Sequence, residues 1–190
     1  MMKISDIPYN MNYSMLENLR EEADDIGEMN KGILFILEKA KEQSHQIDRA
    51  SLLSLAGTYQ RITWQLEESE KSLKEAYQIF KDNRVLLSLV VSTLRLGSVY
   101  HWMGKFGKAE KLFTKALDIC SKSTDEGVRY YLSFAYQHLG KCKFDQHLHN
   151  EAEKYFLRSL DLRILLGDMD LIESTRQALK VNQQKLSRLP

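Results

Sequence analysis

Residues that break helices are scarce in this chain. Only two of its 190 residues are proline, one of them the last residue, and nine are glycine. Proline removes a helical hydrogen bond and glycine weakens a helix interior, so their shortage favours an all-helical chain. Cysteine is equally rare. Cys120 and Cys142 match no metal-binding or redox spacing, so we expect two reduced thiols in the core rather than a disulfide.

Long hydrophobic runs and an excess of one charge are also missing. No stretch approaches the roughly 18 apolar residues that a membrane span requires, and the first residues lack the apolar segment of a signal peptide. We therefore predict a cytoplasmic protein. The 27 basic and 26 acidic residues give a net charge of +1. This balance gives no electrostatic reason to expect nucleic acid or a membrane as the main partner.

Motifs that carry chemistry are absent as well. The sequence holds no glycine-rich phosphate loop, no H-E-x-x-H helix and no G-x-S-x-G turn. Cys142, His147 and His149 lie close together, but no further cluster completes a four-ligand zinc site. We expect no catalytic residue, no metal and no cofactor. An enzyme or an accessory hydrolase is kept as a remote alternative.

Two segments of the chain repeat each other. The stretch LGSVYHWMGKFGKAEKLFTKAL, residues 96–117, aligns with LGKCKFDQHLHNEAEKYFLRSL, residues 139–160, at an offset of 43 residues. The aligned positions include Gly97 with Gly140, Ala109 with Ala152, Phe113 with Phe156, Ala116 with Ser159 and Leu117 with Leu160. A weaker copy has Gly57 in place of Gly97, 40 residues earlier. Repetition with this period is typical of stacked helical units.

Each unit is predicted to be a pair of antiparallel helices. The glycine of the first helix lets the second approach closely, and the large residue of the second helix fills the remaining space. One pair cannot bury both of its apolar faces, so neighbouring pairs complete the core. We expect about nine helices and no strands, with helices near residues 49–65, 69–82, 85–103, 106–121, 124–146, 150–166 and 169–188. The predicted fold class is an all-α right-handed superhelix, an α-solenoid.

The second unit resembles a known repeat family. Its Leu-Gly pair, the following Tyr100, and Ala109, Phe113 and Ala116 at helical spacings are similar to the tetratricopeptide repeat (TPR) pattern. The usual period is about 34 residues. Here it is 40 to 43, which resembles the long-period subclass of kinesin light chains, Pins-like adaptors and bacterial Rap-type regulators. Lys143 departs from the pattern, because it stands where the second unit has Tyr100. The resemblance implies a concave groove that binds peptides.

The domain organisation is inferred from the repeats. We expect residues 1–14 to fray and residues 15–190 to form a single helical repeat domain. Its predicted parts are degenerate leading helices 15–48 broken near Gly32, repeats 49–84, 85–122 and 123–166, and a capping helix 168–188. The last helix keeps a few apolar residues, such as Ala178 and Val181, and is otherwise polar, which is typical of a terminal cap. Truncation at Gly167 is therefore expected to expose Phe156, Leu160 and Leu165.

The N-terminal segment is acidic. Residues 1–49 hold 6 basic and 10 acidic residues, so the rest of the chain is correspondingly basic. The acidic residues gather in ENLREEADDIGE, residues 17–28. Two interpretations stay open. The default is a solvated helix face, and the alternative is an acidic arm that docks on a basic groove elsewhere in the protein.

The first helix of each pair is expected to line the concave groove. One stripe of each first helix can be read off by counting from its glycine. From these stripes and their edges we predict that a partner contacts Arg61, Arg95, Ser98, His101, Trp102, Phe134, Gln137, His138, Lys141, Phe144 and Asp145. An alternative interpretation places Val91, Leu94 and Phe134 in the core, whereas His101 and Trp102 are expected to be exposed anchors. The Lys and Asn pattern of the TPR carboxylate clamp is not present.

The predicted function is a non-catalytic interaction scaffold that binds a peptide or protein segment in its concave groove. The alternative is a regulatory peptide receptor of the bacterial Rap-like type, which shares the fold and the long repeat. Such receptors usually have more repeats and a further N-terminal domain, and no helix-turn-helix is evident before the repeats. Repeats fix the shape of a groove and leave its ligand open.

Overall fold

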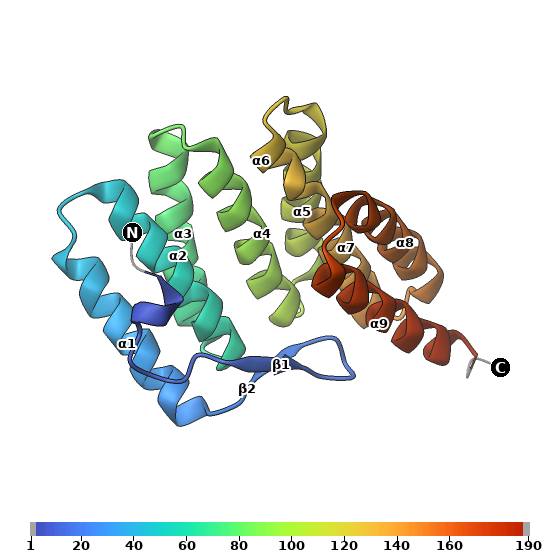
Figure 1. Cartoon of the computed structure of the whole chain (residues 1–190), viewed down its shortest axis with the longest axis horizontal. Helices are drawn as coiled ribbons and strands as arrows, with labels where there is room; N and C mark the ends of the chain where they lie inside the picture. The colour runs from blue at the N-terminus through green and yellow to red at the C-terminus, as the bar shows by residue number, and fades with distance from the viewer. Residues whose placement is uncertain (1–2, 188–190) are drawn as a thin grey trace.

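The chain folds into a row of antiparallel helices with a small β-hairpin laid across it (Figure 1). The computed structural model describes residues 3–187. Before the repeats come the 3-10 helix η1 (Ile4–Asp6), the antiparallel strands β1 (Tyr13–Met15) and β2 (Glu21–Ala23), and helix α1 (Ile26–Glu42). The following helices are α2 (Gln46–Ile62), α3 (Leu66–Asp82), α4 (Leu86–Trp102), α5 (Phe106–Lys122), α6 (Glu126–Tyr130), α7 (Leu132–Asp145), α8 (His149–Leu166) and α9 (Met169–Leu186).

This architecture confirms the predicted α-solenoid, and the bounds of α2–α5 and α8–α9 agree with the predicted ranges to within about three residues. The prediction of no strands is wrong, because β1 and β2 form a two-stranded sheet. The third pair also differs, since its first helix is divided at Tyr131 into α6 and α7.

A glycine in each first helix admits a side chain from the second helix. A Cβ added to Gly57 would lie 2.5 Å from Leu73, and a Cβ on Gly97 would lie 2.5 Å from the ring of Phe113. Gly140 meets Phe156 in the same way. Such distances are far inside van der Waals contact, so no larger residue fits without displacing the second helix. The close approach predicted from the repeat is therefore present in all three pairs.

Neighbouring pairs are joined by a contact that explains the departure at Lys143. In the second pair, Tyr100 donates a hydrogen bond from its hydroxyl to Glu70 of α3 at 3.0 Å. In the third pair, the ammonium of Lys143 lies 3.0 Å from Glu110 of α5. Both side chains thus bind a glutamate on the second helix of the preceding pair. Lysine replaces tyrosine without loss of this contact, because either side chain is a donor long enough to reach the carboxylate.

The N-terminal third differs most from the prediction. A single helix, α1, runs through Gly32, and the segment before it forms the hairpin instead of a first leading helix. The prediction that residues 1–14 fray is wrong for the described part, because Ile7 and Met11 are buried against α1. Gly32 does not break the helix; the Met11 side chain packs onto it. A glycine read as a helix breaker is here a contact site.

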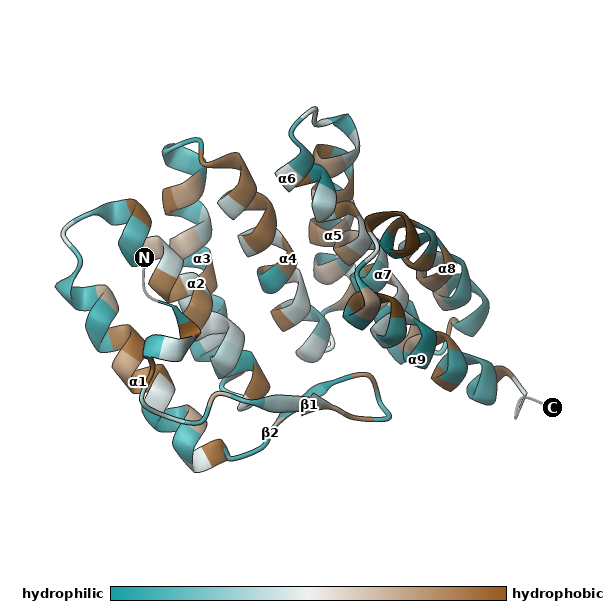
Figure 2. Cartoon of the chain, viewed as in Figure 1, coloured by the Kyte–Doolittle hydropathy of each residue, from teal (hydrophilic) through white to brown (hydrophobic). Residues whose placement is uncertain are grey.

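Helix α9 covers one side of α8, as expected of a cap. Phe156 is fully buried, and the polar side of α9 faces water. Asn182 of α9 also donates a hydrogen bond to the backbone oxygen of His149 at 2.9 Å. The expectation for Leu165 is wrong, because this residue is already 84% exposed in the whole chain. The hydrophobic end of α8 is visible in Figure 2.

Both thiols lie in the core. Cys120 and Cys142 are buried and unpaired with each other. Burial raises the pKa of Cys120 to about 11 and that of Cys142 to about 12, so both stay protonated and unreactive near neutral pH. Within residues 3–187, no helix combines the length and the apolar character needed to cross a membrane.

Candidate functional site

The hairpin of residues 13–23, called here the N-terminal hairpin, runs from α1 toward α9 (Figure 1). Its turn is closed by a hydrogen bond from Leu16 N to Arg20 O at 2.8 Å. The surface that the first helices α2, α4 and α7 turn toward the hairpin is called the inner surface. Three consecutive residues, Leu19, Arg20 and Glu21, reach into it or past it to α9. We call them the tip residues.

Arg20 lies in a slot made by two indole rings and one carboxylate. Its guanidinium carbon is 5.3 Å from the centroid of the Trp64 ring and 5.4 Å from that of the Trp102 ring. Its Nη2 donates to Asp145 Oδ2 at 2.7 Å. All three slot residues stand at or just beyond the C-terminal end of a first helix, where unpaired carbonyl groups favour a cation. Aromatic faces and a carboxylate together suit the flat, delocalised charge of arginine.

Glu21 lies in a neighbouring slot of opposite charge. Arg61 Nη1 donates to Glu21 Oε2 at 2.8 Å, and Lys141 Nζ is 4.0 Å from the other carboxylate oxygen. Burial alone would raise the pKa of Glu21, but the charges of Arg61 and Lys141 outweigh it and hold the pKa well below the ordinary value. Glu21 is therefore ionised when the hairpin is docked. The interpretation of the acidic segment as an arm docked on a basic surface is confirmed for this residue.

Leu19 occupies an apolar slot between the third pair and the cap. It is 4% exposed and packs in a cluster with Phe144 of α7 and with Ala178 and Val181 of α9. Its φ of 64° lies in the left-handed region, which costs an L-residue other than glycine about 1–2 kcal/mol. Full burial of a leucine side chain contributes about 1.5–3 kcal/mol. Burial of the Leu19 side chain thus offsets the backbone strain. This explains why leucine is tolerated at a position better suited to glycine or asparagine.

Two histidines lie beneath the hairpin. His101 Nε2 is 3.0 Å from Asp145 Oδ2, and the ring of His138 stacks on Phe113 with its Nδ1 3.4 Å from Ser98 Oγ. Burial lowers the pKa of His101 despite the nearby carboxylate. Burial also lowers the pKa of His138 to about 3. Both rings are accordingly neutral at physiological pH, and they orient neighbouring groups without adding charge.

The expected exposure of His101 and Trp102 is wrong. The two residues are 3% and 6% exposed. Arg20 and Arg61 cover the Trp102 ring, with Arg61 4.4 Å from its centroid. A segment far away in the sequence supplies part of this cover, so a local pattern could not reveal it.

Three other predicted residues have different surroundings. Phe134 is half-buried beside Tyr130, Tyr131 and Arg163, which agrees with the alternative interpretation that it belongs to the core. Arg95 donates to Ser54 Oγ at 2.9 Å. Gln137 is 4% exposed, yet its side-chain amide nitrogen and oxygen find no hydrogen-bond partner among the described residues. A buried amide without partners is uncommon, so the Gln137 amide is available to a group that the hairpin does not supply.

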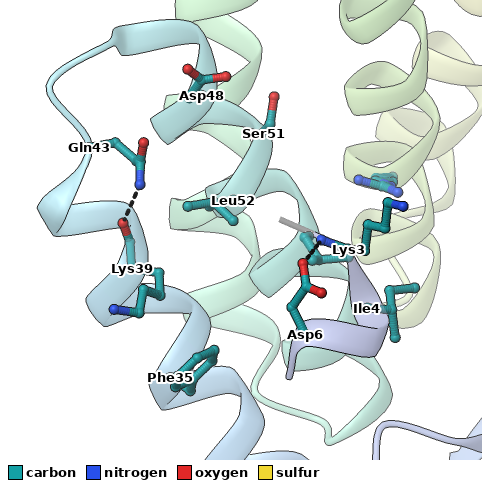
Figure 3. Close-up of a pocket in the computed structure, with 11 residues that line it drawn as sticks. Lys3, Ile4, Asp6, Phe35, Lys39, Gln43, Asp48, Ser51 and Leu52 are labelled. Atoms are coloured by element: carbon teal, nitrogen blue, oxygen red, sulfur yellow. Dashed lines mark hydrogen bonds between the residues drawn. The ribbon is translucent and has the colours of Figure 1, made fainter. Parts of the chain in front are cut away.

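Two cavities of similar size lie at different places on the molecule. One of about 590 Å³ lies between η1, α1 and α2, with Arg95 of α4 also in its wall, and Figure 3 shows most of its lining. Its wall combines apolar residues with charges of both signs, such as Lys39 and Asp48. Another of about 540 Å³ adjoins the hairpin turn and is lined by Glu17, Phe144, Asp145 and residues of α9. The described residues hold no cluster of His, Cys, Asp and Glu able to bind a metal.

The sequence pattern missed Trp64, Leu19 and Arg20. Trp64 has a φ of 62°, and the equivalent positions Gly104 and His147 have φ values of 71° and 61°. Each of these residues ends a first helix, where glycine is the usual choice. A tryptophan at a position where the second repeat has Gly104 was a usable signal, because the strain suggests that its ring has another role. Leu19 and Arg20 carried no such signal, since their contacts are long-range, whereas Glu21 belongs to the acidic segment already considered as a docked arm.

Comparison with known proteins agrees with the repeat assignment. A sequence model of the family described as Tetratricopeptide repeat matches residues 89–164, which covers the second and third helix pairs. The resemblance recognised in the sequence is confirmed for this part of the chain. No curated protein matches the sequence.

Two solved structures share the fold at low sequence identity. The apo form of RapI superposes with a TM-score of 0.67 at 13% identity, over 86% of this chain and 59% of the RapI chain. BtubC (BKLC) from P. vanneervenii superposes with a TM-score of 0.59 at 16% identity, over 87% of this chain and 72% of its own. At these identities the likeness concerns the fold alone. The present chain spans well under two thirds of the length of RapI.

Proposed function

Because the chain carries TPR-type repeats, a fold that generally serves protein interaction without catalysis, we propose that its inner surface binds an extended segment of another protein. In this proposal the inner surface takes the role of the concave groove expected from the sequence. The observation that carries the proposal is that this surface already holds an extended segment of its own chain. The N-terminal hairpin is retained there by side chains set in separate slots, which is how repeat proteins commonly recognise peptides.

The energetics favour recognition over simple structural filling. The inner surface presents buried Arg61, Lys141 and Trp102. Aromatic and arginine side chains in desolvated positions are typical interaction hot spots. A purely structural contact of this size would be more stable with apolar residues, because buried charges lose their hydration.

A peptide selection tests this function. The full chain with Arg20→Ala and Glu21→Ala, which should weaken hairpin docking, is used to select binders from a random 12-residue peptide library displayed on phage, at about the length of the hairpin. Circular dichroism melting first establishes that the variant is folded. We expect enriched peptides whose binding is lost when Trp102→Ala is added and retained when Lys122→Ala is added. Lys122 lies on α5, and among residues 3–187 its ion pair is with Asp118 of its own helix.

Two results would contradict the proposal. The first is a folded variant that enriches no peptide. The second is a set of peptides whose binding is indifferent to Trp102→Ala, because these would bind another surface of the molecule.

A second candidate is a receptor for a short free peptide, and the length of the N-terminal hairpin favours it. Residues 13–23 alone fill the slots of the inner surface, so a free peptide of similar length would need no further protein around it. A thermal-shift screen of short peptides against the same variant separates the two candidates. A saturable rise in Tm with one short peptide supports the receptor, whereas binding that needs a longer folded partner supports the scaffold.

A further inference from the structure

The three slots of the inner surface lie in a fixed order. The apolar slot beside Phe144 is followed by the cation slot of Trp64, Trp102 and Asp145, and then by the anion slot of Arg61 and Lys141. Consecutive residues of one segment fill them. We propose that the partner of this surface carries the same order, an apolar residue followed directly by arginine and glutamate, and that the N-terminal hairpin is a resident copy which the partner displaces. The proposal rests on the proposed function.

The cation slot is the most selective of the three. Arg20 lies against two tryptophan rings that contact each other, with its guanidinium carbon 5.3 and 5.4 Å from their centroids, and it forms an ion pair with Asp145 at 2.7 Å. A flat guanidinium can stack on a ring and donate to the carboxylate at the same time, whereas a lysine ammonium offers no plane to stack. A residue without charge would leave Asp145 without its cation. The slot therefore selects arginine over lysine and over neutral residues.

The anion slot selects an acidic residue at the next position. Arg61 and Lys141 are 7% and 9% exposed, and the described residues offer them one carboxylate, that of Glu21. Two buried cations without an anion are strongly unfavourable. Inversion of the tip sequence would set a cation against Arg61 and an anion against Asp145. The order of the two charges, and not the sum, is what this surface recognises.

The hairpin satisfies the inner surface incompletely. Lys141 Nζ is 4.0 Å from Glu21, beyond hydrogen-bond distance, and among the described residues it donates to the weak acceptor Met15 Sδ at 3.6 Å. Gln137, one turn before Lys141 on α7, has an amide without a partner among the described residues. Leu19 is in the left-handed region. A segment without these three defects binds better than the hairpin does.

These defects matter because the hairpin competes from within the same chain. A segment on a short tether has an effective concentration on the order of millimolar. A well-fitted tethered segment would exclude every partner at ordinary concentrations. An imperfect one keeps the buried charges paired until a better ligand arrives, so the defects make exchange possible.

Two synthetic peptides test the order of charges. One has the sequence of residues 13–23, YSMLENLREEA, and its matched control carries Arg20→Glu and Glu21→Arg, which preserves composition and net charge. Fluorescence anisotropy measures their affinity for the folded full chain with Arg20→Ala and Glu21→Ala. We expect the first peptide to bind at least about tenfold more tightly than the control, and the difference to disappear when Arg61→Met is added. The first peptide should bind the wild-type chain at least about tenfold more weakly than it binds the double variant, because the docked hairpin of the wild-type chain competes with it.

Gln137→Leu gives a readout that a purely structural role would not move. Since the hairpin leaves this amide without a partner, the variant should have an unchanged or slightly raised Tm. It should nevertheless weaken the tightest peptides of the library selection by about threefold or more, because these can reach the amide. A lowered Tm with unchanged peptide affinity would overturn the assignment of Gln137 to the partner.

The remaining outcomes separate this inference from the proposed function. If library peptides depend on Trp102 but lack the apolar–arginine–glutamate order, and the control peptide binds as well as the first, the inference is overturned and the proposed function stands. If no peptide of any kind binds the folded variant, both the inference and the proposed function are overturned.

If sedimentation shows that the wild-type chain dimerises and the dimer is lost with Glu21→Gln, the hairpin is exchanged between two copies, and the assignment to a different partner is overturned. Should the double variant not fold, Glu21→Gln alone takes its place in each arm.

Discussion

The interior of each helix pair and the inner surface are both buried, but they are built from different kinds of residue. The interior is made of a glycine and the ring or branched side chain that packs on it, as in Gly97 with Phe113, and it recurs in every repeat. The inner surface is made of arginine, lysine, tryptophan and aspartate, and each repeat contributes something different. What recurs supports the fold, and what varies between repeats is free to recognise a ligand. The first region is apolar and tightly packed, and the second is polar and is covered in part by the hairpin through Arg20 and Glu21.

Gly97→Leu gives the largest expected effect, because it acts on the repeated interior. A side chain at this position must displace Phe113, and overpacking of this kind costs about 1–3 kcal/mol or more. Gly107→Leu is the matched control, since a Cβ at Gly107 meets nothing within 4 Å. Urea denaturation should show a large loss of unfolding free energy for Gly97→Leu and little change for Gly107→Leu. Equal losses would mean that the glycine contact does not hold the pairs together.

Glu21→Gln is expected to have the next largest effect, and it acts on the inner surface. The hydrogen bond to the charged Arg61 contributes about 1.5–3 kcal/mol to docking, but the hairpin can lift and let water reach Arg61. We therefore expect faster proteolysis within residues 13–23 and almost unchanged global unfolding. Trp102 is 6% exposed under Arg20, so its emission should shift to the red as water enters, whereas Trp64 is already 56% exposed and should change little. Glu22→Gln, on the exposed side of β2, should change neither measurement.

Acidification is a milder way to separate the two regions. The folded-state pKa of Glu21 is depressed below its ordinary value of 4.5, because the charges of Arg61 and Lys141 outweigh burial. The pair therefore stabilises docking fully above that ordinary value and loses its contribution as pH falls toward the depressed pKa. Tryptophan emission should be constant from neutral pH down to about pH 5 and should shift below about pH 4. An identical shift in Glu21→Gln would assign the transition to another group, with Asp145 first in line because its pKa is lowered too.

Lys122→Ala should have the smallest effect. Lys122 pairs with Asp118 on the exposed face of α5, with 75% of its side chain in water. Exposed ion pairs of this type contribute about 0.3–0.5 kcal/mol. Chemical denaturation and tryptophan emission should both stay near wild type. A loss as large as that of Glu21→Gln would show that burial does not distinguish the hairpin ion pairs from ordinary surface pairs.

The sequence by itself determined the repeated part of this protein. The spacing of Gly97, Gly140 and their aromatic partners predicted the helix pairs and the α-solenoid, because a close helix contact requires a small residue opposite a large one at a fixed period. The same counting placed Arg61, Trp102, Lys141 and Asp145 on one surface. Those inferences depend on neighbours a few turns away, and such neighbours leave a pattern in the sequence.

Only the tertiary structure decided what covers that surface. Residues 13–23 show a run of acidic residues with a helical appearance, yet they form a hairpin whose Arg20 pairs with Asp145, 125 residues further along the chain. The same contact turned the expected exposed anchors His101 and Trp102 into buried ones. Strand pairing and ion pairing over such separations depend on where the folded helices end in space. A local pattern carries no information about that position, which is why the hairpin and the order of its three slots emerged only from the folded chain.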